Sequence, residues 1–183
     1  MIARGIVSFL ALAAIGCGGP NATPQPNLAV WSPPPDWVTV SNVEGSIQLT
    51  LPPNIQAFDN HGAIFANEPP RAAGAEIPIQ VWAEGPVTDD TPRPGEDLLA
   101  WVERRLENPG KGTPTVTQVS LPAGAGIRYD RVDSAGTPNA WRIVVFAIET
   151  PSGVAWLLLD GPPDEWAARA EDLERVALLF RVR

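Results

Sequence analysis

Two consecutive apolar segments near the C-terminus constrain the fold of this chain more than any other feature. Residues 140–149 and 154–160 are expected to be strands, and Thr150-Pro151-Ser152-Gly153 joins them in a pattern typical of a type I turn. A hairpin pairs its strands antiparallel, and antiparallel sheets usually leave one face in water. Here apolar side chains occupy both sets of alternate positions in both strands. The pattern therefore predicts a central antiparallel sheet flanked by helices on both faces.

Further strands are expected from short alternating segments that end at turn residues. Residues 46–51 show the pattern most clearly, because Ile47, Leu49 and Leu51 alternate with polar side chains. Hairpins are predicted around Glu44-Gly45 and across Pro122-Ala123-Gly124. The other expected strands are 38–43, 46–51, 62–66, 77–83, 115–121 and 126–133, with a short strand or extended tail over 179–183.

Two amphipathic helices complete the expected α+β domain. The first covers 96–108, and Pro109-Gly110 ends it. The second follows Gly161-Pro162-Pro163, with Asp164 as its expected N-cap. The predicted buried stripes are Leu99, Val102 and Leu106 in the first helix, and Trp166, Ala170, Leu173 and Ala177 in the second.

The first 17 residues have the pattern of a bacterial lipoprotein signal. Arg4 supplies positive charge, residues 6–15 are apolar, and small residues precede Cys17, the only cysteine. Ten helical residues span about 15 Å, roughly half of a hydrocarbon core, which is too short for a transmembrane helix. The run from Leu12 to Cys17 resembles a lipobox, which implies cleavage after residue 16 and a lipid such as palmitate on Cys17. An ordinary signal peptide with an incidental cysteine is the alternative.

These patterns predict three parts of the chain. Residues 1–16 are the lipoprotein signal peptide, residues 17–36 are a lipidated Pro/Gly-rich tether, and residues 37–183 are one folded domain. Proline favours extended polyproline II, so the tether would hold the domain away from the bilayer. The expected location is the extracytoplasmic face of a bacterial cell membrane, with the lipid on Cys17 as the membrane contact.

The charge of the expected mature chain excludes some classes of partner. Removal of 16 residues, including Arg4, leaves 167 residues with 12 basic and 21 acidic side chains and a net charge of −9. Nucleic acid requires clustered positive charge, so it is not an expected partner. One cysteine permits no internal disulfide, so a hydrophobic core must stabilise the domain.

The sequence shows no arrangement that indicates catalysis. His61 is the only histidine, and in Asp59-Asn60-His61-Gly62 it is expected in an exposed turn. One histidine without a free thiol makes a zinc site improbable on chemical grounds. Gly110-Lys111-Gly112-Thr113 lacks the spacing of a phosphate-binding loop. Catalytic, cofactor-binding and metal-binding residues are therefore predicted to be absent, and no cofactor is expected.

Acidic and aromatic groups receive structural interpretations. Asp89-Asp90, with Glu84 and Glu96-Asp97, could supply oxygen ligands to calcium, but the spacing favours a solvated acidic loop. Arg128, Tyr129, Asp130 and Arg131 are explained by cross-strand ion pairs. Five tryptophans are expected in the core: Trp82, Trp101, Trp141, Trp156 and Trp166. Trp31, in the tether, is expected to dock on the domain or to have no role.

From residue 37 onward, the order of elements resembles Mog1/PsbP-like domains, including PsbP-like bacterial lipoproteins. The resemblance is carried by Leu121-Pro122-Ala123-Gly124 leading to Arg128-Tyr129, by the apolar hairpin, by the helix that opens near Trp166, and by Leu179-Phe180-Arg181. It implies an antiparallel sheet between helix layers and a largely non-catalytic binding, assembly or accessory role. No binding residue of a relative is transferred to this chain.

Three functions are compatible with the sequence. The leading one is a non-enzymatic, lipid-anchored lipoprotein whose domain binds a protein or another envelope component. The second is a small-ligand or lipid-binding module on the cell surface, which requires a pocket. The third is an enzyme that uses carboxylates alone, which requires two buried carboxylates about 5–10 Å apart in a cleft.

Overall fold

The computed structural model describes residues 32–183 except 60, 74, 88–89 and 107–111. Residues 32–183 form one compact unit. The predicted signal peptide, Cys17 and Trp31 lie outside the described residues, so the predictions about them stay predictions. Within the described part of the chain, no helix is long and apolar enough to cross a membrane.

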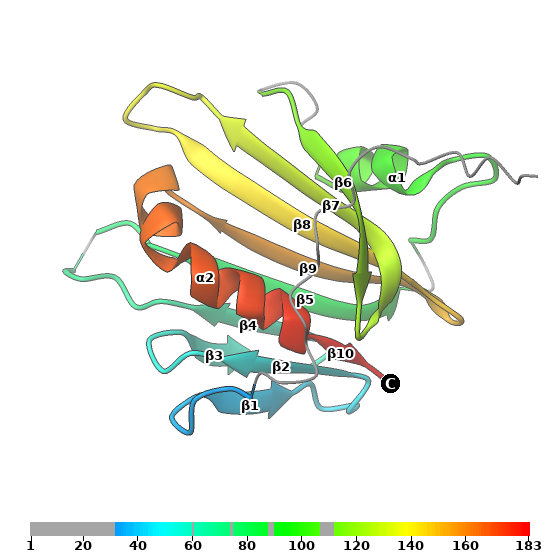
Figure 1. The fold of residues 1–183 in the computed structure, drawn as a ribbon, viewed down its shortest axis with the longest axis horizontal. Helices are drawn as coiled ribbons and strands as arrows, with labels where there is room; N and C mark the ends of the chain where they lie inside the picture. Colours follow the sequence, from blue (N-terminus) through cyan, green and yellow to red (C-terminus); the bar gives the residue numbers. More distant parts are fainter. Residues whose placement is uncertain (1–31, 60, 74, 88–89, 107–111) are drawn as a thin grey trace, which may run out of the picture. The chain divides into compact units, whose positions relative to one another are not determined.

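Seven antiparallel strands form the larger sheet (Figure 1). The apolar hairpin predicted from the sequence lies at its centre, with Thr150 paired to Gly153 at the turn. Strands that differ widely in sequence position flank this hairpin on its two sides. The order across the sheet is β3 (Gln56–Asp59), β4 (Ala63–Asn67), β5 (Gln80–Val87), β9 (Gly153–Gly161), β8 (Trp141–Thr150), β7 (Gly124–Asp133) and β6 (Thr115–Leu121).

A smaller sheet of three strands has the order β1 (Val38–Ser41), β2 (Ile47–Leu51) and β10 (Arg181–Val182). The β1–β2 hairpin turns at Gly45, whose φ of 68° favours glycine. Val182 pairs with Ile47, so the end of the chain returns to its first hairpin. The expected tail over 179–183 is therefore partly a strand.

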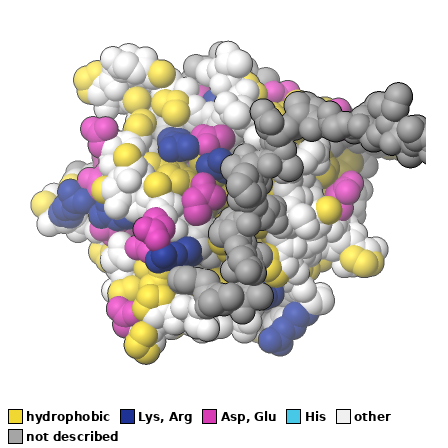
Figure 2. Space-filling view, in the orientation of Figure 1, with side chains coloured by type: hydrophobic (Ala, Val, Ile, Leu, Met, Phe, Trp, Pro, Cys, Tyr) yellow, Lys and Arg dark blue, Asp and Glu magenta, His cyan; other side chains and the backbone are white. Residues whose placement is uncertain are grey.

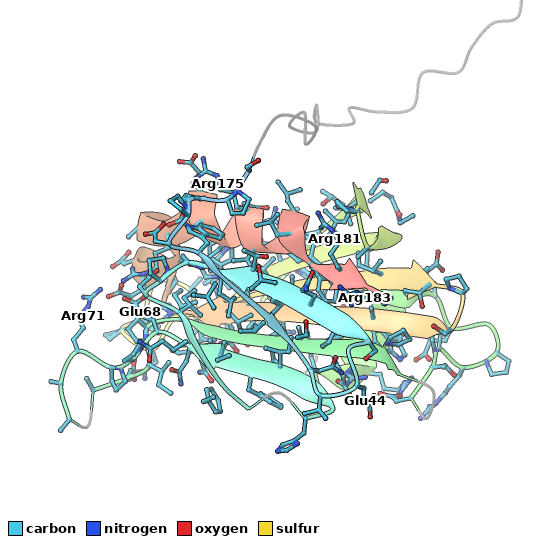
Figure 3. All side chains as sticks on the ribbon, turned by 90° about the horizontal axis from the view of Figure 1, so that it is seen from below. Glu44, Glu68, Arg71, Arg175, Arg181 and Arg183 are labelled. Atoms are coloured by element: carbon cyan, nitrogen blue, oxygen red, sulfur yellow. The ribbon has the colours of Figure 1, made fainter. Side chains whose placement is uncertain are left out.

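One face of the large sheet packs against β2 and the helix α2 (Pro163–Leu179). Figure 3 shows α2 as a layer on one side of the sheet, with Arg175 on its outer side. Every second residue of the central hairpin points into this core. The buried set includes Val144, Phe146 and Ile148 of β8, Ala155, Leu157 and Leu159 of β9, Trp166, Leu173, Val176 and Ala177 of α2, Ile47, Leu49 and Leu51 of β2, and Phe180. Burying one large apolar side chain contributes about 1.5–3 kcal/mol.

The intervening residues of β8 and β9 point to the opposite face, where they meet the helix α1 (Leu98–Arg105). Trp101 and Val102 of α1 are completely buried against Tyr129, Val145 and Trp156. The central hairpin is thus covered on both faces, by α2 and β2 on one and by α1 on the other. On β3 and β4, this second face carries exposed or half-exposed side chains.

The helix ends differ in part from the expectations. α1 begins after Asp97, whose carboxylate accepts a hydrogen bond from the Ala100 N–H at 2.8 Å. The expectation that Asp164 caps α2 was wrong, because the N-cap is Pro162 and makes no side-chain hydrogen bond. Pro163 at the first helical position has no N–H that needs a partner, so the helix begins without a polar cap.

The buried positions of α1 also differ from the expected stripe. Trp101 and Val102 are its buried residues, whereas Leu99 and Leu106 are partly buried at its margins. The strand β3 was missed because its four residues do not alternate regularly and a bulge falls between Ala57 and Asp59.

Ion pairs bind the sheet to α2. Asp130 of β7 accepts two hydrogen bonds from Arg142 of β8, at 3.0 and 2.7 Å, which is a cross-strand pair of the expected kind. The Arg142 guanidinium lies 4.5 Å from the ring centre of Trp166, and Arg128 reaches Glu174 of α2 at 2.9 Å. Figure 2 shows charged side chains of both signs mixed on this side of the molecule.

Close contact between β7 and β8 generates a stability prediction. A Cβ atom on Gly126 would lie 2.0 Å from the carbonyl oxygen of Ala147. Gly126→Ala is therefore expected to lower the free energy of unfolding by about 1–3 kcal/mol, because the strands must separate to admit the methyl group. Urea denaturation measures the change. Gly62→Ala, where a Cβ meets no atom within 4 Å, is the control and should stay within about 0.5 kcal/mol of the native value. Equal losses in the two variants would contradict the steric argument.

Candidate functional site

A row of aromatic rings crosses the face of the large sheet opposite α2. In order, the rings belong to Phe58 of β3, Phe65 of β4, Trp82 of β5, Trp156 of β9 and Trp101 of α1, with successive centroids 6.3, 5.4, 6.2 and 5.6 Å apart. Phe58 is 66% exposed, whereas Trp156 and Trp101 are buried. This aromatic row therefore begins in solvent and ends in the core.

Strand register and a bulge produce the exposed end of the aromatic row. Phe65 and Trp82 are directly opposite each other in the β4–β5 pair, and their rings stack with an angle of 19° between the planes. Phe58 lies at the bulge of β3, which allows an edge residue to point across the face. The stacked Phe65–Trp82 pair and the tilted, exposed ring of Phe58 thus form an aromatic platform on this face.

Arg105, at the end of α1, lies among three tryptophans of the aromatic row. Its guanidinium carbon is 5.7, 5.4 and 5.0 Å from the ring centres of Trp82, Trp101 and Trp156. Its side chain is only 12% exposed, and it forms ion pairs with Glu84 and Asp90. Two carboxylates and three ring faces offset the cost of removing this cation from water.

Arg104 forms a second clamp beside Arg105. Its Nε and Nη2 donate to the two carboxylate oxygens of Glu96 at 2.9 and 3.0 Å, and its Nη1 donates to Asp90 at 2.6 Å. The hydrogen bond from Arg104 and a second one from the Arg93 backbone lower the pKa of Glu96 to about 2. The Glu96 carboxylate is therefore ionised over the physiological pH range, and together with Asp90 it ties the segment before α1 to the helix through Arg104.

A cavity of about 460 Å³ lies between these groups. Its lining consists of Trp82, Asp90, Arg93, Arg104 and Arg105. Two buried donors of the lining, the indole N–H of Trp82 and the Nε–H of Arg105, have no hydrogen-bond partner among the described residues. A flat ring face next to guanidinium and carboxylate groups can bind a ligand or a protein side chain that offers both apolar and polar surface.

Asp160 lies farther along the same face, on β9, opposite Gln80 of β5 and Ile143 of β8. Burial raises the pKa of Asp160 from 3.8 to about 6, and a hydrogen bond with Trp141 opposes part of that rise. Its Oδ1 atom has no hydrogen-bond partner among the described residues. Asp160 is therefore a carboxyl group that changes its charge near neutral pH.

The residues that the sequence analysis singled out lie in different parts of the structure. His61 is exposed after β3, and its carbonyl oxygen accepts a hydrogen bond from the Val43 N–H. Glu84, Asp90 and Glu96 do come together, but around Arg104 and Arg105 rather than in a solvated acidic loop. In the parts of the chain that the structure describes, no group of three or more His, Cys, Asp and Glu side chains is placed to hold a metal ion. Asp89 and Lys111 lie outside the described residues.

The sequence interpretation missed the main components of this site. The sequence analysis gave no functional role to Arg104, Arg105 or Phe58. Trp101, Trp156 and Trp166 are buried as expected, but Trp82 and Trp141 are only partly buried. The available signal was the Arg-Arg pair three residues after Trp101 on an amphipathic helix, which places a cation near that indole.

No protein-family model matches the chain, and no curated protein matches its sequence. Its fold does match solved structures. The cyanobacterial PsbP protein CyanoP of Synechocystis aligns with a TM-score of 0.52 and 12% identity over 80% of this chain and 92% of that chain. A mutant of Mog1 aligns with a TM-score of 0.51 and 15% identity over 80% of this chain and 95% of that chain.

A third match, a protein from Bacteroides thetaiotaomicron, has a TM-score of 0.48 and 11% identity over 79% of this chain. This chain spans only 48% of the length of that protein. At such identities the matches concern the fold alone, and no residue role passes from these proteins to this chain.

Asp160 generates a prediction about pH. Its pKa is higher in the folded chain than in the unfolded chain, so the folded state binds the proton more tightly. The resulting stability is complete below pH 3.8 and is lost as the pH rises through about 6. Asp160→Asn is expected to be about 1–3 kcal/mol more stable than the native chain at pH 8, with the difference vanishing near pH 3.5. Urea unfolding at a series of pH values measures this difference, and a constant offset at every pH would contradict the assignment.

Proposed function

Because the domain has the Mog1/PsbP-like fold, we propose that this protein is a non-enzymatic binding module. Lipid on Cys17 would anchor it at the extracytoplasmic face of a bacterial cell membrane. The folded domain would bind a protein or another component of the cell envelope through the exposed end of the aromatic row.

The first support for this proposal is the N-terminal sequence. An apolar segment of ten residues, small residues and a single cysteine form the lipobox-like pattern described above. The Pro-rich segment that follows separates the proposed lipid from the compact unit that begins at residue 32. An anchor of this kind brings the domain within reach of other envelope components without burying its surfaces.

The aromatic row is the observation that carries the binding proposal. An exposed phenylalanine beside a stacked Phe65–Trp82 pair is apolar surface in contact with water, which marks interaction sites on soluble proteins. Aromatic side chains also contribute most of the binding free energy at protein interfaces. The adjoining cavity adds charged groups and two donors without partners among the described residues. A bound partner would bury the apolar rings and supply acceptors to these donors.

A second candidate function rests on an apolar groove elsewhere in the domain. A cavity of about 340 Å³ between β1 and β3 is lined by Val38, Val40, Leu51, Pro53, Ile55, Gln56 and Ala57. Its lining carries no charged side chain. This groove favours the alternative of a module that binds a small apolar ligand or a lipid chain.

The anchor is tested by membrane fractionation and intact mass of the native chain and of Cys17→Ser. The native chain is expected in the membrane fraction with the mass of residues 17–183 plus lipid, because more than one acyl chain gives stable attachment. Cys17→Ser is expected to lack the lipid mass and to leave the membrane fraction. Identical behaviour of the two chains would contradict lipidation at Cys17.

The binding surface is tested by affinity capture from detergent-solubilised envelopes, with matched aspartate substitutions at exposed apolar positions. Phe58→Asp is expected to abolish capture, because it places a charge on the exposed aromatic platform. Ala167→Asp, on the exposed side of α2, should leave capture unchanged. Loss with Val38→Asp alone would instead favour the apolar groove, where Val38 is 56% exposed. Capture that none of the three variants changes would contradict both surfaces.

A further inference from the structure

The two sheets have four edge strands, namely β3 and β6 in the large sheet and β1 and β10 in the small one. An edge strand presents backbone N–H and C=O groups that its own sheet does not pair, and these groups can pair with another chain. Folded proteins usually protect such edges by short length, bulges, charges or proline. Comparison of the four edges therefore shows which of them is open to pairing.

Three of the four edges are protected. The strand β1 has four residues, and β10 has two. The strand β3 also has four residues and is interrupted by the bulge between Ala57 and Asp59. None of these strands offers a long, regular line of backbone groups.

The strand β6 has none of these protective features. All seven of its residues pair in unbroken register with β7, from Thr115 opposite Asp130 to Leu121 opposite Gly124. Its sequence, Thr-Val-Thr-Gln-Val-Ser-Leu, contains no charge and no proline. Residues 115–118 are exposed on the domain, and Figure 1 shows β6 at the margin of the large sheet.

We propose that β6 pairs with β6 of a second copy of this chain. The two strands would run antiparallel about a two-fold axis at Gln118, so that the two large sheets join into one continuous sheet. Homodimers with two-fold symmetry use the same surface on both copies, and an antiparallel pair of identical strands satisfies that condition. The proposal concerns self-association and does not depend on the proposed binding function.

Charge favours a second copy at this edge. The chain carries a net charge of −8, so most of its surfaces repel a second copy. In the proposed register, Thr117 faces Val119 of the second copy, Val116 faces Ser120, and Gln118 faces Gln118. No like charges therefore oppose each other, and the β-branched Thr117 and Val116 meet a β-branched and a small polar side chain on the two sides of the joined sheet.

Cysteine cross-linking in the membrane-anchored full chain tests the register. Gln118→Cys places two thiols opposite each other at the two-fold axis, so a mild oxidant is expected to produce a disulfide-linked species of twice the chain mass. The parent chain controls for Cys17, and Ser152→Cys, on the exposed β8–β9 turn, controls for random collision. If Gln118→Cys gives no more dimer than Ser152→Cys, or cross-links only to a protein of different mass, the proposal is overturned.

Charge exchange tests the same contact without cross-linking. Two differently tagged copies of the chain are co-expressed, and their co-purification is measured. Copies that both carry Gln118→Lys, or both Gln118→Glu, are expected to lose co-purification, whereas Gln118→Lys with Gln118→Glu should recover it. Recovery in the mixed pair would show that both variants fold, so a folding defect could not explain the losses in the matched pairs. Absence of co-purification for the parent pair, or its retention by the Gln118→Lys pair, would overturn the proposal.

Discussion

Burial of both faces of the β8–β9 hairpin is the constraint on which the rest of the structure depends. Val144 and Phe146 point to one face and Val145 and Ala147 to the other, and all are buried. Neither face could remain in water without exposing several large apolar side chains. The chain meets this requirement unequally. The long helix α2 and the strand β2 cover one face, whereas the eight-residue helix α1 packs over β7, β8 and Trp156 of β9 on the other.

The unequal cover explains where the candidate site lies. Because α1 is short, the aromatic row continues past it onto β5, β4 and β3, where the rings reach solvent. Arg105 lies where the surface covered by α1 meets the open surface. It lies among three tryptophans and forms ion pairs with Glu84 and Asp90. Arg105 and Trp82 both line the cavity at this boundary.

The proposed binding face and the free edge of the sheet lie at opposite ends of the strand order. The aromatic platform occupies β3 to β5, and β6 is the last strand on the other side. Pairing of two copies through β6 would therefore leave both platforms accessible and double the number of contacts that one assembly makes. Two linked sites bind a repeated or dimeric partner more tightly than one site does, without any new contact.

Local features of the fold were readable from the sequence. The central hairpin, the β6–β7 hairpin, Trp166 in α2 and the exposed turn at His61 all follow from patterns that span a few residues. The candidate site was not readable, because Phe58, Trp82 and Arg105 come from segments that meet only when β5 pairs with β9 and α1 packs on the sheet. The sequence by itself determined that the hairpin at 140–160 needed cover on both faces, since alternation is a local property of a strand. Only the tertiary structure decided which segments supply that cover and which rings stay exposed, because those outcomes depend on pairings between residues far apart in the chain.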